Sequence, residues 1–151
     1  DLINQDLRSR MLQSSLFAGL AISSTRTTLS HSISYPLTLR FGIPHGLACA
    51  FTIVPVLQFN ASRDPDRLQW LVEPIGFNSH ETLGDTIKNV LAISNTYSTL
   101  NNLIPSKEAV IALASESLTP ARADNNFTNA SLADVESILE ESWGRMVTFS
   151  I

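Results

Sequence analysis

The chain has 151 residues, enough for one domain with a buried core, and it is poor in charge: 16% of its residues are charged and 44% are hydrophobic. A charged fraction so far below the usual quarter indicates that part of the surface is covered by another domain or subunit. The net charge is −4, and the ten Lys and Arg residues are scattered singly. Without a basic stripe to neutralise phosphates, nucleic acid is not expected as a partner.

Neither a membrane span nor a disulfide is expected. The apolar run from Leu47 to Phe59 is too short to cross a bilayer and is interrupted by Pro55 and Gln58. The single cysteine, Cys49, lies in the apolar stretch LACAFTIV, which predicts a buried, inert thiol in a reducing compartment such as the cytoplasm. The chain begins DLINQD, without an initiator Met or a targeting segment, so we expect it to be part of a longer protein.

The first expected helix covers Leu7 to Ile22, where apolar residues recur at helical spacing. The small residues of SSLFAGLAISS predict close approach of another helix. A second helix should carry His31 and end near Pro36, because the residue before a proline disfavours helical dihedrals. Residues 42–44, Gly-Ile-Pro, then predict a turn.

The next expected helix begins within PHG and runs through HGLACAFTIVPVLQFN, with a kink at its internal proline. Asp64 and Ser79 are suited to cap helices over PDRLQWLVEPIG and ETLGDTIKNVLAISNTYSTL. A short helix over SKEAVIALASESL and a loop over TPARADNNFTNAS should follow. Ser131 with Asp134 predicts a capping pair for LADVESILEESW, whereas the tail WGRMVTFSI fits either a short strand or a packed arm.

No stretch shows the alternation typical of strands, so the sequence predicts an all-α fold: one domain over residues 1–151, built as an antiparallel helical bundle with short connections. No Gly-rich phosphate-binding loop follows a strand anywhere in the chain, so nucleotide binding is not expected from this domain alone.

Two of the three histidines, His31 and His45, lie in the short segment HSISYPLTLRFGIPHG. Their separation matches no local metal motif, and packing or hydrogen bonding to a carbonyl is the ordinary role of a helical histidine. The turn at residues 42–44 nevertheless folds the second helix beside the first, so both imidazoles can converge on one point, as in metal sites of helical bundles. His45 would open a helix, where the dipole favours the neutral imidazole that binds metal.

The segment SLFAGLAISSTRTTLSHSISYPLTLRFGIPHGLACAFTIVPVLQFN resembles the C-terminal half of the iron-containing alcohol dehydrogenases, within the dehydroquinate-synthase-like superfamily. The resemblance rests on the AGLA helix, the histidine helix and the PHG turn, at the family's spacing. It implies that His31 and His45 are two of four protein ligands to a divalent metal, Fe2+ in most members and Zn2+ in some. The remaining Asp and His ligands would precede this chain, and NAD or NADP would be bound mainly by an N-terminal nucleotide-binding domain.

The resemblance also implies roles for residues near the histidines. Many members carry a second histidine one turn after the first ligand, and Tyr35 occupies that position here. Its phenol could hydrogen-bond the substrate or relay a proton, although a tyrosine before proline often only packs. The motifs ISYPLT and GIPHG are most similar to those of members that act on phosphonate-type aldehydes. Arg40 could therefore bind an anionic group of the substrate. Phe41 could line the same pocket.

We therefore hypothesise that the chain is the metal-binding, substrate-side domain of an NAD(P)-dependent alcohol dehydrogenase or aldehyde reductase. The domain would be inactive on its own, and the whole protein could form a homodimer. Small alcohols or aldehydes would be the substrates. Two alternatives stay open: a zinc-dependent enzyme similar to glycerol dehydrogenase, and a stand-alone helical interaction module without chemistry. The third histidine, His80, follows Ser79 at an expected helix start and is interpreted as a surface or capping residue.

Overall fold

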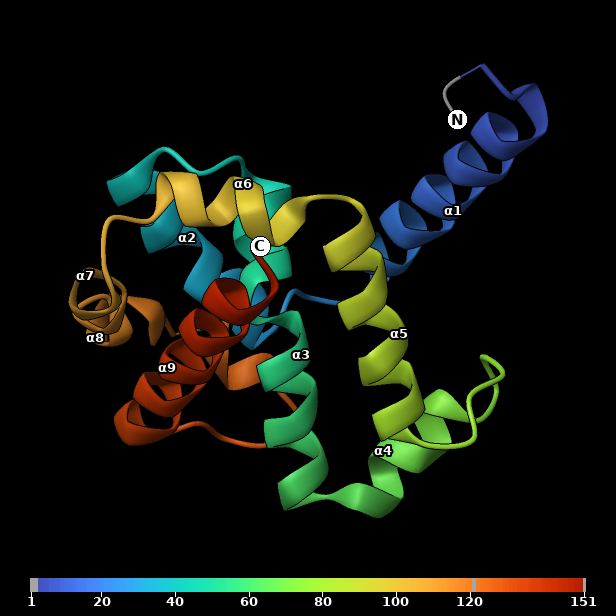
Figure 1. Cartoon of the computed structure of the whole chain (residues 1–151). Helices are drawn as coiled ribbons and strands as arrows, with labels where there is room; N and C mark the ends of the chain where they lie inside the picture. Colours follow the sequence, from blue (N-terminus) through green and yellow to red (C-terminus); the bar gives the residue numbers. More distant parts are fainter. Residues whose placement is uncertain (1–2, 121, 151) are drawn as a thin grey trace.

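The structure is a computed structural model that describes residues 3–120 and 122–150, and in these residues it contains helices and no strand (Figure 1). Asp1, Leu2, Ala121 and Ile151 lie outside the described residues. The helices are α1 (Gln5–Ser24), α2 (Leu29–Phe41), α3 (His45–Arg63), α4 (Pro65–Val72), α5 (His80–Ile93), α6 (Thr96–Leu103), α7 (Lys107–Ile111), α8 (Ala114–Ser117), the 3-10 turn η1 (Ala123–Asn125) and α9 (Leu132–Phe149). The predicted all-α class is confirmed.

Helix α3 lies at the centre of the domain, where it packs against α2, α5 and α9. The main core is formed by apolar residues of α2, α3, α6, α7 and α9, and a smaller cluster at the far end of α3 joins α4. Leu29, Ile33 and Leu37 of α2 recur every four residues and are fully buried, as are Val135 and Leu139 of α9. One apolar face from each long helix therefore meets the others around α3.

The prediction that the second helix ends near Pro36 was wrong, because α2 continues to Phe41 with Pro36 inside it. A proline within a helix costs about 3 kcal/mol, since its nitrogen cannot donate to the carbonyl four residues earlier. The helical register across Pro36 keeps Leu37 in line with Ile33, and burying each such side chain contributes about 1.5–3 kcal/mol. Core packing therefore outweighs the local preference. The helix ends at Gly42, whose φ of 68° is left-handed, so the predicted turn is confirmed.

The predicted caps are also confirmed. Asp64 accepts from the backbone N–H of Arg67, and reciprocal capping boxes open α5 at Ser79 and α9 at Ser131. The predicted helix over residues 81–100 is instead divided into α5 and α6 by Asn95, whose φ of 55° ends the helical path.

Two further predictions need correction. The helix predicted over residues 106–118 is divided into α7 and α8 by a turn. The tail is neither a strand nor an arm, because α9 continues through it to Phe149 and buries Met146 completely. Met146 and Ile138 lie on the same face of α9, eight residues apart, so the tail adds to the core stripe already begun in LADVESILEESW.

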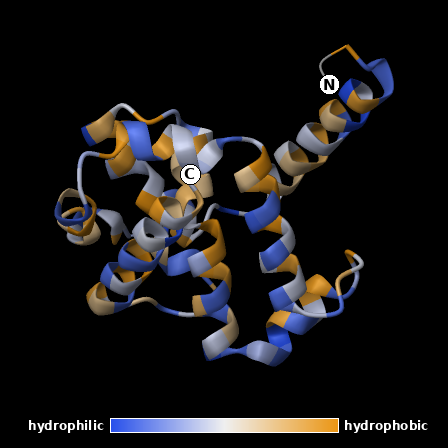
Figure 2. Cartoon of the chain, viewed as in Figure 1, coloured by the Kyte–Doolittle hydropathy of each residue, from blue (hydrophilic) through white to orange (hydrophobic). Residues whose placement is uncertain are grey.

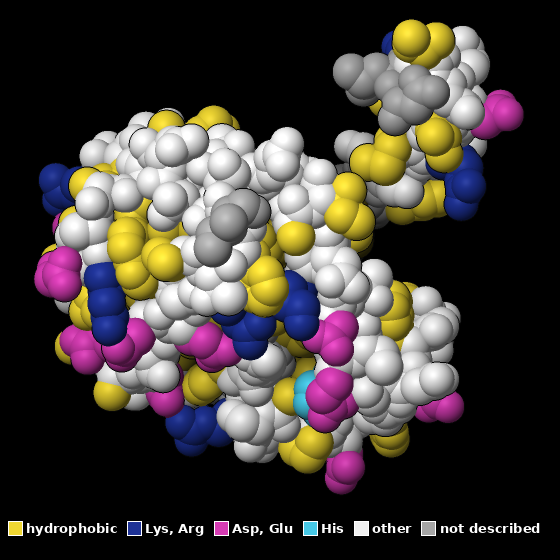
Figure 3. All heavy atoms as spheres, viewed as in Figure 1, with side chains coloured by type: hydrophobic (Ala, Val, Ile, Leu, Met, Phe, Trp, Pro, Cys, Tyr) yellow, Lys and Arg dark blue, Asp and Glu magenta, His cyan; other side chains and the backbone are white. Residues whose placement is uncertain are grey.

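Helix α1 projects from the body and none of its residues is buried (Figures 1 and 2). Its apolar side chains are exposed, and yellow patches mark them along the projecting helix in Figure 3. The exposed set consists of Leu7, Met11, Leu12, Leu16, Phe17, Leu20 and Ile22. The close helix neighbour predicted from its small residues is not found among the described parts of the chain. No helix of the described residues combines the length and apolar character needed to cross a bilayer.

Candidate metal centre

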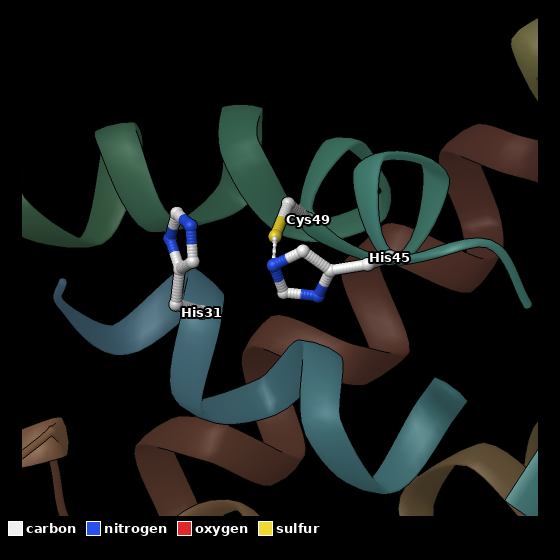
Figure 4. Close-up of side chains that lie close together, drawn as sticks. All are labelled: His31, His45 and Cys49. Carbon is white, nitrogen blue, oxygen red and sulfur yellow. Dashed lines mark hydrogen bonds between the residues drawn. The ribbon is translucent and has the colours of Figure 1, made fainter. Parts of the chain in front are cut away.

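The turn between α2 and α3 brings His31 and His45 together (Figure 4). His31 lies in the first turn of α2, and His45 is the first residue of α3. Their rings are 5.4 Å apart, centroid to centroid, at an edge-on angle of 62°. Residues 42–44 lead the chain back along α2, so that His45 lies beside Ser34 rather than beside the end of the helix. The convergence expected from the turn is therefore present in the structure.

Ser34 determines which nitrogen of His45 carries the proton. The Ser34 hydroxyl donates to the backbone carbonyl of His31 over 2.7 Å, which uses its only proton. Its oxygen lies 3.3 Å from Nδ1 of His45 and must therefore accept from that nitrogen. We assign His45 the tautomer with a proton on Nδ1 and a lone pair on Nε2, the nitrogen that accepts from the Cys49 thiol. A metal-binding histidine is commonly held in this way by a hydrogen bond at its other nitrogen.

Cys49 lies one helical turn after His45, with its sulfur 3.7 Å from Nε2 of that residue (Figure 4). The ligand atoms of His31, His45 and Cys49 all lie within 4.8 Å of one another. Burial raises the pKa of the Cys49 thiol. The thiol predicted to be buried and inert is only half-buried, and it contacts His45 in a polar cluster.

The electrostatics of the cluster favour the neutral form of His31. Partial burial lowers the pKa of His31, and the neighbouring His45 lowers it further. His45 is exposed and His31 half-buried, so an ion can reach both. The donor set fits a divalent transition metal, since imidazole nitrogen and thiol sulfur are the ligand types that iron and zinc accept in proteins. Two converging imidazoles, one with an oriented lone pair, are what such an ion requires from this part of a site.

Tyr35 lies beside the histidines, one turn after His31. Its ring centroid is 5.7 Å from that of His45. The guanidinium carbon of Arg122 lies over the Tyr35 ring, 4.1 Å from its centroid. Arg122 forms no ion pair with a carboxylate in the described part of the chain, and its charge lies against the ring of Tyr35.

The other residues singled out from the sequence lie elsewhere or are engaged. Arg40 is exposed and forms an ion pair with Glu116, with Nη2 3.0 Å from the carboxylate. Phe41 is partly buried and packs against the main core. His80 is the first residue of α5, where Nε2 lies 3.0 Å from Glu81, and it takes no part in the cluster of His31 and His45. Its interpretation as a residue of a helix start agrees with this position.

Two residues near the site were not predicted from the sequence: Cys49, which belongs to the cluster, and Arg122, which contacts Tyr35. His45 and Cys49 form an H-x-x-x-C pair, a spacing that places both on one helix face, so the signal was present and the apolar surroundings of Cys49 concealed it. Arg122 comes from the loop between α8 and α9, far along the chain from Tyr35. No local pattern could have predicted that contact, which depends on how α2 and the loop pack.

A second group of charged residues surrounds a cavity of about 450 Å3 between α3, α5 and α9. Here each charged group has a partner of opposite charge. Glu81 pairs with His80, Asp85 lies 2.6 Å from Lys88, and Arg145 lies 2.7 Å from Glu141. Basic and acidic side chains accordingly alternate over this face in Figure 3. The group has the character of a structural ion-pair network rather than of a ligand set.

Comparisons with known proteins identify the family of the chain. The sequence model of the C-terminal part of the Fe-containing alcohol dehydrogenase family matches residues 1–143. The chain therefore belongs to this family. The relatives described below are alcohol and aldehyde oxidoreductases.

Three relatives illustrate the range. Phosphonoacetaldehyde reductase of Streptomyces viridochromogenes is 49% identical over 43 residues, which are 28% of this chain and 11% of the relative. The 1-propanol dehydrogenase of Salmonella typhimurium is 38% identical over 72 residues, 46% of this chain and 20% of the relative. Lactaldehyde reductase of Escherichia coli is 25% identical over 149 residues, 93% of this chain and 39% of the relative. The chain thus spans well under half the length of these relatives. No solved structure gives a significant match.

Proposed function

We propose that this chain is the metal-binding, substrate-side domain of an NAD(P)-dependent alcohol dehydrogenase or aldehyde reductase. The observation that carries the proposal is the convergence of His31 and His45, whose ligand atoms lie within 4.8 Å of each other on two different helices. Helical segments elsewhere in the whole protein would supply the remaining ligands. Iron(II) is the first candidate ion because of the family, and zinc is the alternative.

When bound, a divalent metal supplies Lewis-acid polarisation of the substrate oxygen, and a nicotinamide cofactor supplies or accepts the hydride. The chain's own residues prepare the place for this chemistry. The pKa of His31 is lowered, which favours its neutral form, and Ser34 orients His45 so that the lone pair of Nε2 points to the side of Cys49. Holding these groups before the ligand binds avoids the cost of ordering them later.

Tyr35 and Arg122 would act on the substrate itself. The phenol oxygen of Tyr35 is proposed to hydrogen-bond the substrate or to relay a proton, at the position where many family members have a histidine. The guanidinium of Arg122, stacked on Tyr35, would attract an aldehyde that carries a negatively charged group. The similarity to a phosphonoacetaldehyde reductase supports an anionic substrate of that kind. In this respect Arg122 replaces Arg40, which pairs with Glu116.

Helix α1 is the proposed contact with the rest of the whole protein. It carries exposed apolar side chains over its length and buries none of its residues within this chain. The relatives are more than twice as long as the chain, so the nucleotide-binding domain and its neighbouring helices would have to pack somewhere. Packing of another part of the whole protein against α1 would account for the apolar surface of this helix and for the low charged fraction of the chain. A second copy of the protein would add to the cover in a homodimer.

The test uses the whole protein, stripped of metal and reloaded with iron(II) or zinc, with NAD(P)H oxidation followed on a panel of short aldehydes. We expect activity only after reloading, and its loss in the His45→Ala variant. His80→Ala is the matched control, because it removes the chain's third histidine and should leave activity unchanged. Metal-independent activity, or equal activity of His45→Ala and the control, would contradict the proposal and favour a helical module without chemistry.

A further inference from the structure

The only cysteine of the chain faces the two histidines. Cys49 and His45 stand four residues apart on α3, and this spacing places both side chains on one helix face. The sulfur lies 3.7 Å from Nε2 of His45, and with the proton of His45 on Nδ1 the thiol donates to that nitrogen, a bond that an entering ion would replace. A single metal ion could therefore bind both the sulfur of Cys49 and Nε2 of His45.

We propose that Cys49 is a further ligand of the candidate metal centre, and that its sulfur shifts the preference of the site from iron(II) towards thiophilic divalent ions such as zinc. The inference rests on the proposed function, since it assumes that His31 and His45 hold a metal. It goes further because it assigns a third ligand from this chain and predicts which class of ion the site selects. Thiolate selects zinc-type ions over harder ones, whereas imidazole accepts zinc and iron alike.

The position of Cys49 favours a ligand over a packing residue. A half-buried sulfur is open to an entering ion, whereas a packing cysteine is usually enclosed by apolar side chains. Its neighbours in the cluster are polar: His45 at Nε2, His31 across the gap, and the hydroxyl of Ser34. When the sulfur–metal bond forms, the thiol proton leaves to solvent, so binding releases a proton.

The experiment uses the full-length protein, stripped of metal and titrated with cobalt(II), an ion whose spectrum reports its ligands. A sulfur ligand gives an intense charge-transfer band in the near ultraviolet, and nitrogen and oxygen ligands do not. We expect this band in the wild type and its loss in Cys49→Ala and Cys49→Ser, which still bind cobalt through the histidines. Ser62→Ala, at the exposed far end of α3, is the control and should keep the band.

Competition with a chromophoric chelator then gives the affinities. Loss of a ligand should weaken zinc binding by at least about tenfold, because even partners outside the ligand shell contribute about 10–100-fold. Iron(II) binding should weaken less, so the ratio of zinc to iron affinity should fall in Cys49→Ala. Zinc should also protect Cys49 from alkylation by iodoacetamide, measured on its peptide by mass spectrometry, and this readout needs no variant.

The two proposals fail in different ways. Cobalt bound without the charge-transfer band, with equal affinities in Cys49→Ala and no protection from alkylation, would overturn the role of Cys49 and leave the histidine site intact. Cobalt binding that survives His31→Ala and His45→Ala unchanged would overturn both. A band that persists in Cys49→Ala would assign the sulfur to another part of the protein and also overturn the inference.

Discussion

The chain contains two polar clusters of opposite character. At the start of α3, His31, His45 and Cys49 face one another with no carboxylate of the described residues between them. Between α3, α5 and α9, by contrast, His80 lies against Glu81 and Arg145 against Glu141. The first cluster gathers groups that repel when charged, and the second neutralises each charge within the chain.

The difference shows why a cavity is a poor guide to function here. A cavity of about 450 Å3 is lined by residues of the second cluster, where hydrogen bonds and ion pairs already satisfy the polar groups. Exposed pairs of this type contribute about 0–1 kcal/mol to stability and leave little capacity for a ligand. In the first cluster the nitrogen lone pair and the sulfur contact each other and no carboxylate of the described residues, so both can bind an ion. The guanidinium of Arg122 lies over Tyr35 and pairs with no carboxylate of the described residues.

The largest effect that would sharpen this comparison concerns Arg122. Arg122→Gln removes the charge beside Tyr35, and a charge-assisted hydrogen bond contributes about 1.5–3 kcal/mol. We expect KM for an aldehyde with an anionic group to rise about 10–100-fold in the whole enzyme, while KM for propanal stays unchanged. Arg40→Gln is the matched control, since Arg40 is paired with Glu116. A selective loss in the control instead would place the anion at the end of α2.

Ser34 gives the next largest expected effect. Ser34→Ala leaves both ligands in place but removes the hydrogen bond that orients His45. Partners of this kind contribute about 10–100-fold to metal affinity, and we expect a loss near the lower end, about tenfold. A chelator competition measures it, with Ser62→Ala as control. Unchanged affinity would show that His45 needs no support from α2.

The smallest effect belongs to the second cluster. Lys88 donates to Asp85, and that hydrogen bond, with the attraction between the charges, lowers the pKa of the carboxyl group. A lowered folded-state pKa stabilises the fold above the ordinary carboxyl pKa, and the contribution is lost as pH falls through the lowered value. Lys88→Met should therefore unfold at a slightly lower urea concentration than the wild type at pH 7. In acid the two proteins should unfold at the same urea concentration.

Metal binding should not change in Lys88→Met. A clear drop in metal affinity, measured by the same chelator competition, would show that the two clusters are coupled. Equal stability at both pH values would mean that solvent screens the pair completely.

The helical class, the caps and the meeting of the two histidines were predictable from the sequence because they depend on short-range signals. Capping residues act within one turn, and the turn at residues 42–44 needs only Gly42 and Pro44. The continuation of α2 through Pro36 was not predictable in this way, because it depends on burial of Leu37 by helices distant in the chain. Local preference lost to tertiary packing at that point.

The residues of the site also differ in whether the sequence alone could predict their contacts. His31, His45 and Tyr35 stand close together in the sequence, whereas Arg122 reaches Tyr35 only through the packing of a distant loop. For helix α1, the sequence predicts a buried face but not the surface that covers it. Its periodicity indicates a helix and its apolar residues predict burial, but no surface within the described residues covers it. A pattern can predict that a face is to be buried without identifying what buries it.

The most direct measurement is an anomalous difference map from crystals of the whole protein, reloaded with zinc or iron and recorded at the absorption edge of that metal. We predict one strong peak within bonding distance of the imidazole nitrogens of His31 and His45, and no peak at His80. A peak in the cavity lined by His80, Glu81 and Asp85, or metal-loaded crystals with no peak at His31 and His45, would contradict it.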